Sequence, residues 1–212
     1  MNWTARKHAR LAGIVAAGAV TAATALSAAP AQAAHGTTSL AEVLAADGNR
    51  LDHNWRDFDI LDKAVHAVLE AKPDSPVAVL ADGSTPLTAF LPTDRAFRRL
   101  ITDLTGDRKA TERGVLRTIT EAVSVDDLEA TLLYHVVPGA TVTYRQARHA
   151  DDARLTTALG PVIRVNVTRE VLLRDRDLDA RNPRVLRSLR DLNKGNEQIA
   201  HGIGRVLRPI DF

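Results

Sequence analysis

The chain of 212 residues is long enough for one domain with a substantial core, and it contains no cysteine. The absence of cysteine excludes disulfides, a thiol nucleophile and a cysteine-based zinc or iron–sulfur centre. The formal net charge is only +2, because 28 lysines and arginines nearly balance 26 acidic residues. This balance excludes a general electrostatic attraction to nucleic acid.

Residues 1–33 have the three-part pattern of a secretory signal peptide. A basic stretch opens the segment, residues 11–29 are largely apolar, and the sequence AQA at 31–33 has the small-x-small form that signal peptidase cleaves. The alternative is a membrane anchor, which the alanine-rich run disfavours because alanine contributes little to membrane insertion. We therefore predict a secreted, extracellular protein that is cleaved near Ala33 and has no membrane span after cleavage.

The next part of the chain predicts helices followed by a hairpin. Ser39 opens a capping box before a short helix, which Gly48 is placed to end. A second helix is expected from about Asp57 to just before Pro73, because its apolar residues recur every three or four positions. Two apolar runs within 77–92 flank an Asp-Gly pair, which predicts a β-hairpin.

Further along the chain, helical patterns give way to strand patterns. Thr93 or Asp94 is expected to cap a helix, a mixed-surface helix is expected over 107–122, and Ser124 begins another helix that runs into LLYHVVPG at 132–139. Beyond this stretch, β-branched residues and period-two alternation predict strands in four segments, 141–144, 155–159, 162–173 and 199–207. Because helices mostly precede strands, the pattern indicates an α+β domain.

Tyr134 and His135 lie side by side in LLYHVVPG, where they could be a catalytic pair, a haem ligand set, a recognition motif or core residues. On a helical wheel begun at Leu128, His135 falls on the apolar stripe and Tyr134 falls off it. A histidine on an apolar stripe is usually buried and bonded to backbone groups. We therefore expect His135 to be structural and predict that Tyr134, with the turn at Pro138 and Gly139, forms the candidate partner-binding patch.

Three blocks of the sequence together resemble the motifs of fasciclin domains. LTAFLPTDRAF at 87–97 resembles the first motif, LLYHVVPG resembles the central Tyr-His motif, and HGIGRVLRP at 201–209 resembles the last. The order and the spacing of the blocks also agree. We therefore expect a fasciclin-like domain over residues 38–210.

This resemblance implies a single α+β domain, a fasciclin-like wedge of two β-sheets with several packed helices. It also implies an extracellular adhesion module whose partners are proteins or glycans. Within the matching blocks, Thr93, Asp94, His135 and His201 are expected to be structural motif residues. The last motif usually carries an aspartate where this chain has Gly204, so any contact that the aspartate makes in relatives is missing here.

Two acidic segments imitate metal sites without matching one. The alternating acids of 175–182 resemble the opening of a calcium loop, but Ala180 and Leu186 stand where such a loop requires glycine and glutamate. We predict a solvated loop there. The second group contains Asp52, His53, Asp57, Asp59 and Asp62. Helix capping and the helix dipole explain these acids more simply, so we predict no metal site.

The sequence contains no G-x-S-x-G elbow, no P-loop and no G-x-G-x-x-G motif. We predict a non-catalytic, cofactor-free adhesion module whose partner is a protein or glycan of the cell envelope or extracellular matrix. A bacterial source is inferred from the excess of arginine over lysine and the abundance of alanine. Two alternatives stay open: a small-ligand or haem carrier that uses Tyr134, His135 or His201 as the ligand, and an extracellular hydrolase without a nameable catalytic group.

Overall fold

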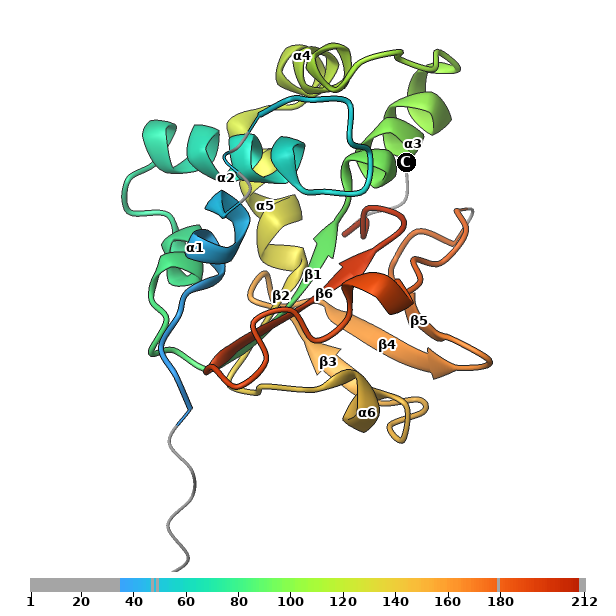
Figure 1. Cartoon of the computed structure of the whole chain (residues 1–212). Helices are drawn as coiled ribbons and strands as arrows, with labels where there is room; N and C mark the ends of the chain where they lie inside the picture. The colour runs from blue at the N-terminus through green and yellow to red at the C-terminus, as the bar shows by residue number, and fades with distance from the viewer. Residues whose placement is uncertain (1–34, 47, 49, 179, 210–212) are drawn as a thin grey trace, which may run out of the picture. The chain divides into compact units, whose positions relative to one another are not determined.

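The computed structural model describes residues 35–46, 48, 50–178 and 180–209, which belong to one compact unit of helices and two small β-sheets (Figure 1). The predicted signal peptide, residues 1–33, lies outside the described residues. None of the helices in the described ranges is both long and apolar enough to cross a membrane.

Most α-helices of the described chain begin after a serine or threonine whose side chain accepts a hydrogen bond from an exposed backbone N–H group. Ser39 forms a complete capping box, and Ser124 accepts a hydrogen bond from the backbone N–H of Asp127. The α-helices are α1 (Leu40–Ala45), α2 (Asp59–Ala71), α3 (Asp94–Thr105), α4 (Glu112–Ala122), α5 (Val125–Tyr134) and α6 (Tyr144–Ala147), and the 3₁₀ helices are η1 (Pro76–Ala81) and η2 (Arg187–Leu189).

The strands form two three-stranded sheets in the order β2-β1-β6 and β3-β4-β5. Their bounds are β1 (Leu87–Pro92), β2 (Val136–Pro138), β3 (Arg154–Thr156), β4 (Val162–Val167), β5 (Val171–Arg174) and β6 (Gln198–Ile203). Strand β1 pairs antiparallel with β2 and parallel with β6, with Phe90 opposite His201. Every residue of β1 and β6 is buried, so these two strands form the centre of the fold.

Two hydrophobic clusters lie on either side of the β2-β1-β6 sheet. The larger cluster joins this sheet to α1–α5, which Figure 1 shows gathered on one side of it. The smaller cluster joins the same sheet to β3-β4-β5 through residues such as Phe90, Ile163, Leu173 and Ile203. The three motif blocks supply β1, β2 and the second half of β6, so the residues that carry the family resemblance form much of the layer between the two clusters.

The predicted hairpin over 77–92 is wrong in its first half. Pro76 occupies the first turn of η1 and Ser75 caps it, so this apolar run forms a 3₁₀ helix. The Asp82 carboxylate accepts hydrogen bonds from the hydroxyls of Ser84 and Thr85, which closes the following turn. Only β1 is a strand, and its partners are β2 and β6 rather than the preceding run.

Other differences concern the ends of the predicted elements. The helix expected over 107–122 begins at Glu112, where the Thr111 side chain caps it. The strand expected at 141–144 is instead a loop followed by α6, because Thr143 and Gln146 form a capping box. The other strand predictions are confirmed with shifted bounds, and the long run over 162–173 divides into β4 and β5.

Candidate functional site

His135 follows the last turn of α5 and uses both ring nitrogens within the protein. Its Nδ1–H donates to the Thr131 carbonyl oxygen at 2.7 Å, and its Nε2 accepts from the backbone N–H of Leu207 at 2.9 Å. This pattern requires the neutral ring protonated on Nδ1. The residue is 3% exposed, and burial lowers its pKa to about 4. The expectation that this ring bonds to backbone groups is confirmed.

His201, in β6, is held in the opposite tautomer. Its Nδ1 accepts from the backbone N–H of Asp191 at 3.1 Å, and its Nε2–H donates to the Val142 carbonyl oxygen at 2.8 Å. Burial also lowers the pKa of this imidazole. His135 thus joins the end of α5 to the segment after β6, and His201 joins β6 to the loops that contain Val142 and Asp191. Neither ring presents a free nitrogen to solvent.

Tyr134 does not lie where the helical wheel places it. The residue is fully buried in the smaller cluster, and burial raises its pKa to about 12. The wheel is misleading because α5 ends here, with one side against the larger cluster and its last residue against the smaller one. The predicted patch thus loses its aromatic member, although Pro138 and Gly139 are exposed.

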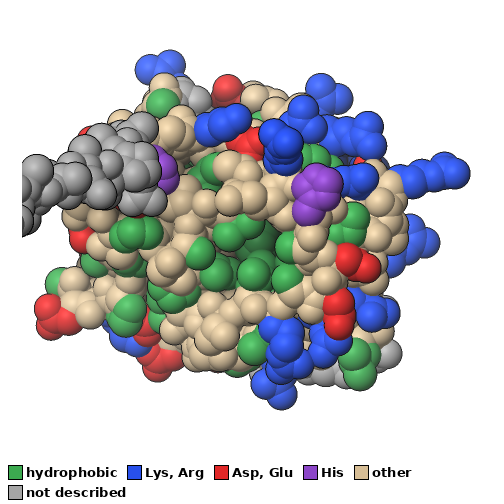
Figure 2. Space-filling view, turned by 90° about the horizontal axis from the view of Figure 1, so that it is seen from below, with side chains coloured by type: hydrophobic (Ala, Val, Ile, Leu, Met, Phe, Trp, Pro, Cys, Tyr) green, Lys and Arg blue, Asp and Glu red, His purple; other side chains and the backbone are tan. Residues whose placement is uncertain are grey.

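These placements bear on the carrier alternative. Haem ligation needs an accessible imidazole nitrogen or phenolate. All three candidate side chains are buried, and both imidazoles are bonded to backbone groups. Figure 2 shows an apolar hollow on the face that carries α6, and Phe90, Tyr144 and Leu173 are among its lining residues. Its volume is about 30 Å³. That space holds no more than about two water molecules, which is far too small for a porphyrin.

A buried carboxyl cluster lies where α2, α3 and α4 begin. The cluster consists of Asp57, Asp94 and Glu112. Of these three, only Asp57 belongs to the acidic group noted in the sequence. Asp94 Oδ1 accepts from the backbone N–H of Ile60 at 3.0 Å, and Glu112 Oε2 accepts from that of His53 at 2.9 Å. Thr93 occupies the N-cap position of α3, but its side chain makes no capping bond.

Carboxylate oxygens are the donors that calcium and magnesium prefer, so the cluster has suitable atoms for a cation. Two other features already relieve its charge. Three helix N-termini point their positive ends at it. Burial, followed by the charges of Asp57 and Glu112, raises the pKa of Asp94 to about 9, which favours the protonated form of this carboxyl at neutral pH. We therefore assign the cluster a structural role.

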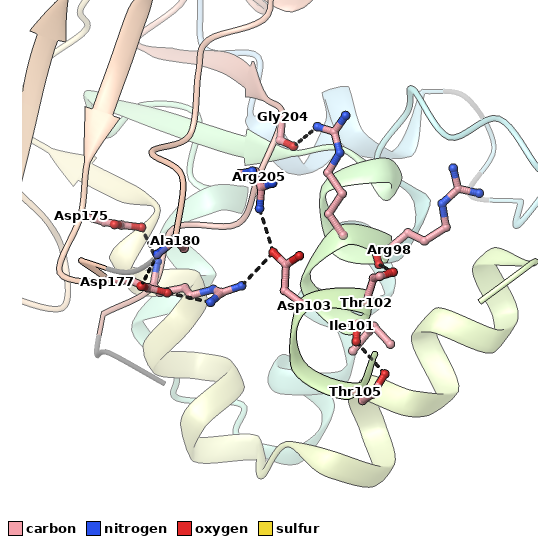
Figure 3. Close-up of polar contacts among 12 residues, drawn as sticks. Arg98, Ile101, Thr102, Asp103, Thr105, Asp175, Asp177, Ala180, Gly204 and Arg205 are labelled. Carbon is pink, nitrogen blue, oxygen red and sulfur yellow. Dashed lines mark hydrogen bonds and ion pairs between the residues drawn. The ribbon is translucent and has the colours of Figure 1, made fainter. Parts of the chain in front are cut away.

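The calcium-like segment is less solvated than expected. Asp177 is 3% exposed, and its Oδ2 accepts from the Arg208 guanidinium at 2.7 Å. Asp175 Oδ2 accepts from the backbone N–H of Arg208 at 2.9 Å, and burial raises the pKa of Asp175 to about 6. Asp179 lies outside the described residues. These acids hold the last described residues of the chain against the loop, as Figure 3 shows around Asp175 and Asp177.

The clearest surface feature is a concentration of arginines around α3. We call it the arginine face, and it consists of Arg56, Arg95, Arg98, Arg99, Arg108, Arg181, Arg184 and Arg205. These residues line three adjoining hollows, all of which include Arg99. The largest hollow has a volume of about 530 Å³. No pattern in the sequence predicts this face, because its members are spread from residue 56 to residue 205.

Few of these positive charges are neutralised by neighbours. Arg205 pairs with Asp103 at 2.8 Å and Arg184 with Glu170 at 3.3 Å. The other six arginines form no ion pair with a carboxylate in the described part of the chain. In Figure 3, Asp103 faces Arg205 on one side of α3, whereas the Arg98 guanidinium extends away from it. Burial lowers the pKa of Arg99, and three neighbouring arginines lower it further because like charges repel one another.

Comparison with known proteins identifies the class to which this fold belongs. The fasciclin domain family profile matches residues 62–209, so the chain belongs to the fasciclin domain family. The match includes all three motif blocks recognised in the sequence. Fasciclin domains are generally non-catalytic adhesion modules and are typically extracellular. No curated protein matches the chain.

A solved structure of similar fold is the FAS1 domain pair of the insect cell adhesion molecule fasciclin I. The TM-score is 0.51 at 14% sequence identity, and the alignment covers 82% of this chain and 51% of that one. The present chain therefore spans about half the length of the domain pair. At this identity the likeness establishes the α+β FAS1 fold in a single domain and nothing about the partner.

Proposed function

We propose that this protein is a secreted, non-catalytic adhesion module that binds a macromolecule of the bacterial cell envelope or its surroundings. Membership of the fasciclin family supports a role in adhesion. The signal-like pattern of residues 1–33 supports export. The engagement of His135 and His201 with the backbone supports a non-catalytic role, because it removes the best candidates for acid–base chemistry from contact with a substrate.

The single observation that carries the proposal is the arginine face. A guanidinium group that bonds to no carboxylate or carbonyl group of its own chain keeps its N–H donors available to a partner. Here Arg56, Arg95 and Arg108 are exposed and make no side-chain bond within the described residues. A concentrated, unpaired charge next to hollows is a surface suited to a charged partner.

The test is capture of envelope material by the purified chain, expressed with its leader and immobilised on beads. We expect specific retention of an envelope component. Retention should fall strongly for the variant Arg56→Gln/Arg95→Gln/Arg108→Gln. The matched control is Arg145→Gln/Arg154→Gln/Arg174→Gln, which removes the same charge from three exposed arginines of α6, β3 and β5. Equal loss of retention in both variants, or no retention by the parent, would contradict the proposal.

The carrier alternative predicts a different result. A haemin titration followed by absorbance should give no stoichiometric band shift that depends on His135 or His201, because both rings are buried and bonded to the backbone. A shift that His201→Ala abolishes in a folded variant would favour the carrier and count against adhesion as the main role.

A further inference from the structure

We propose that the arginine face binds an anionic polysaccharide, whose successive acidic sugars pair with guanidinium groups along α3 and the adjoining loop. This inference rests on the proposed function and specifies the chemistry of its partner. Four features of the face support it: unpaired charge, extended shape, few exposed aromatic rings, and an open position at Gly204.

The first feature is an excess of positive charge held on a rigid support, with Asp103 the one carboxylate among the described residues that line the three hollows. Arg95, Arg98 and Arg99 project from two consecutive turns of α3, a helix anchored by its buried residues Ala96, Phe97 and Ile101. Arg184 and Arg205 face them from the segments before η2 and after β6. Because guanidinium groups remain charged and bind carboxylates, sulfates and phosphates bidentately, this arrangement recognises anions at several points.

The second feature is the extended shape of the face. One hollow includes Trp55 and Ser188, a second includes Asn182 and Arg205, and a third includes Thr102 and Arg108, and all three meet at Arg99. A small anion would occupy a single enclosed pocket. A series of connected open hollows with arginines along it instead suits a chain-like ligand with repeated charges.

The third feature separates a polysaccharide from a nucleic acid. Proteins that hold single strands combine basic grooves with several aromatic platforms on which bases stack. Trp55 is the one aromatic side chain among the described residues that line the three hollows. The Arg98 guanidinium covers its ring, with the carbon 3.8 Å from the ring centroid. The face therefore offers charge and hydrogen-bond donors rather than stacking surfaces.

The fourth feature provides a sharp test. The Gly204 carbonyl accepts a hydrogen bond from Arg99 Nη1 at 2.8 Å, and Figure 3 shows this carbonyl beside Arg205. A Cβ atom at Gly204 would lie 3.5 Å from Arg99 Nη1 and 3.5 Å from Leu186, which is ordinary contact distance. Gly204→Asp therefore adds a carboxylate among the arginines without a steric clash, whereas Gly204→Asn adds nearly the same shape without charge.

The binding experiment uses the purified chain with polygalacturonate and dextran sulfate as anionic probes, neutral dextran as the negative probe, and a single-stranded DNA oligonucleotide as the competing polymer. We expect both anionic polysaccharides to bind and neutral dextran not to bind. Added salt should weaken the binding, because each contact releases counterions. Comparison of polygalacturonate with dextran sulfate shows whether carboxylate or sulfate is preferred.

The variants then locate the binding. Gly204→Asp should weaken polysaccharide binding by about tenfold, and Gly204→Asn should change it by less than about threefold. The Arg56→Gln/Arg95→Gln/Arg108→Gln variant should weaken binding by about tenfold or more and reduce its salt dependence. The Arg145→Gln/Arg154→Gln/Arg174→Gln control should bind nearly as well as the parent. Thermal unfolding of each variant checks that it is folded.

Each contrary outcome overturns the inference in a recognisable way. Equal weakening by Gly204→Asp and Gly204→Asn would show that charge at this face does not matter. Tighter binding of the oligonucleotide than of either polysaccharide would assign the face to nucleic acid. Failure of both anionic polysaccharides while envelope capture succeeds would remove this inference and leave the proposed adhesion function intact.

Discussion

The Nε2 atom of His135 accepts a hydrogen bond from the backbone N–H of Leu207, a residue 72 positions further along the chain. The bond joins the end of α5 to the segment that follows β6, and both groups are buried. Since the Nδ1–H of the same ring donates to Thr131, one side chain connects the central motif block to the last one. The histidine of the Tyr-His motif thus has a structural role in this chain.

Replacement of His135 by alanine should destabilise the protein clearly. The change leaves the Leu207 N–H without its acceptor in a buried site and creates a cavity, so we expect a loss of at least about 1–3 kcal/mol in the free energy of unfolding. Urea denaturation of His135→Ala measures the loss. The control is His149→Ala, because His149 is exposed. Equal midpoints for the two variants would contradict the structural role.

The contribution of His135 to the stability of the protein should fall on acidification below pH 6.5. In the folded state burial lowers the pKa of His135 from 6.5 to about 4, so between these values the unfolded chain binds the additional proton. The contribution of His135 to the free energy of unfolding is fully present above pH 6.5 and decreases by up to about 3 kcal/mol as the pH approaches 4. The parent and His135→Ala share every other titrating group, so the difference between their free energies of unfolding, measured by denaturation at each pH, should shrink as the pH falls across this range.

Tyr134 should tolerate loss of its hydroxyl but not loss of its ring. The ring fills the smaller cluster, so Tyr134→Ala should cost about 3–5 kcal/mol, as for other large buried aromatics. Tyr134→Phe keeps the ring and should change stability by no more than about 1–2 kcal/mol. Envelope capture by Tyr134→Phe should equal that of the parent. A strong loss of capture by this folded variant would restore Tyr134 as a contact residue.

Asp94→Asn should stabilise the protein at neutral and alkaline pH. The folded-state pKa of Asp94 is raised from 3.8 to about 9. The contribution of Asp94 to the free energy of unfolding is therefore fully present below pH 3.8 and is lost as the pH rises to about 9. The loss for one proton is about 1.4 kcal/mol per pH unit. Asparagine can donate to Asp57 without carrying charge. Between pH 7 and 9 the variant should show a flatter decline than the parent and than the exposed control Asp74→Asn.

Gln198→Leu should be among the more destabilising single changes. The Gln198 amide is fully buried: it donates to the carbonyl oxygens of Val79 and Asp82 at 2.7 Å and accepts from the backbone N–H of Leu40 at 2.8 Å. Leucine would leave all three backbone groups unpaired, which should cost about 3 kcal/mol or more. Urea denaturation measures this cost, and a change below about 1 kcal/mol would show that other partners replace the amide.

Local signals in the sequence were sufficient for much of the secondary structure. The caps at Ser39 and Ser124 act within four residues, so sequence reasoning located α1 and α5 correctly. The hairpin prediction failed because strand pairing is not local. The partner of β1 is β6, with Leu87 opposite Gln198, and the run at 77–81 takes the 3₁₀ form after Pro76.

The candidate site was less predictable than the fold. Arg56, Arg99 and Arg205 come together only after α3 packs near the end of β6, and their separation in sequence gives no signal. The burial of Tyr134 was missed for a related reason. A helical wheel describes one face of one helix, whereas Tyr134 is covered by a second sheet built from later residues.

The parallel pairing of β1 with β6 has a consequence for how the protein is made. The middle strand of the central sheet acquires its second neighbour only when residues 198–203 have been synthesised. A nascent chain that stops short of them leaves one edge of β1 unpaired, so the central sheet is completed only after residues 198–203 have been made. Because β1 and β6 lie far apart in the sequence, we expect their pairing to form later in folding than the pairing of the neighbouring strands β4 and β5.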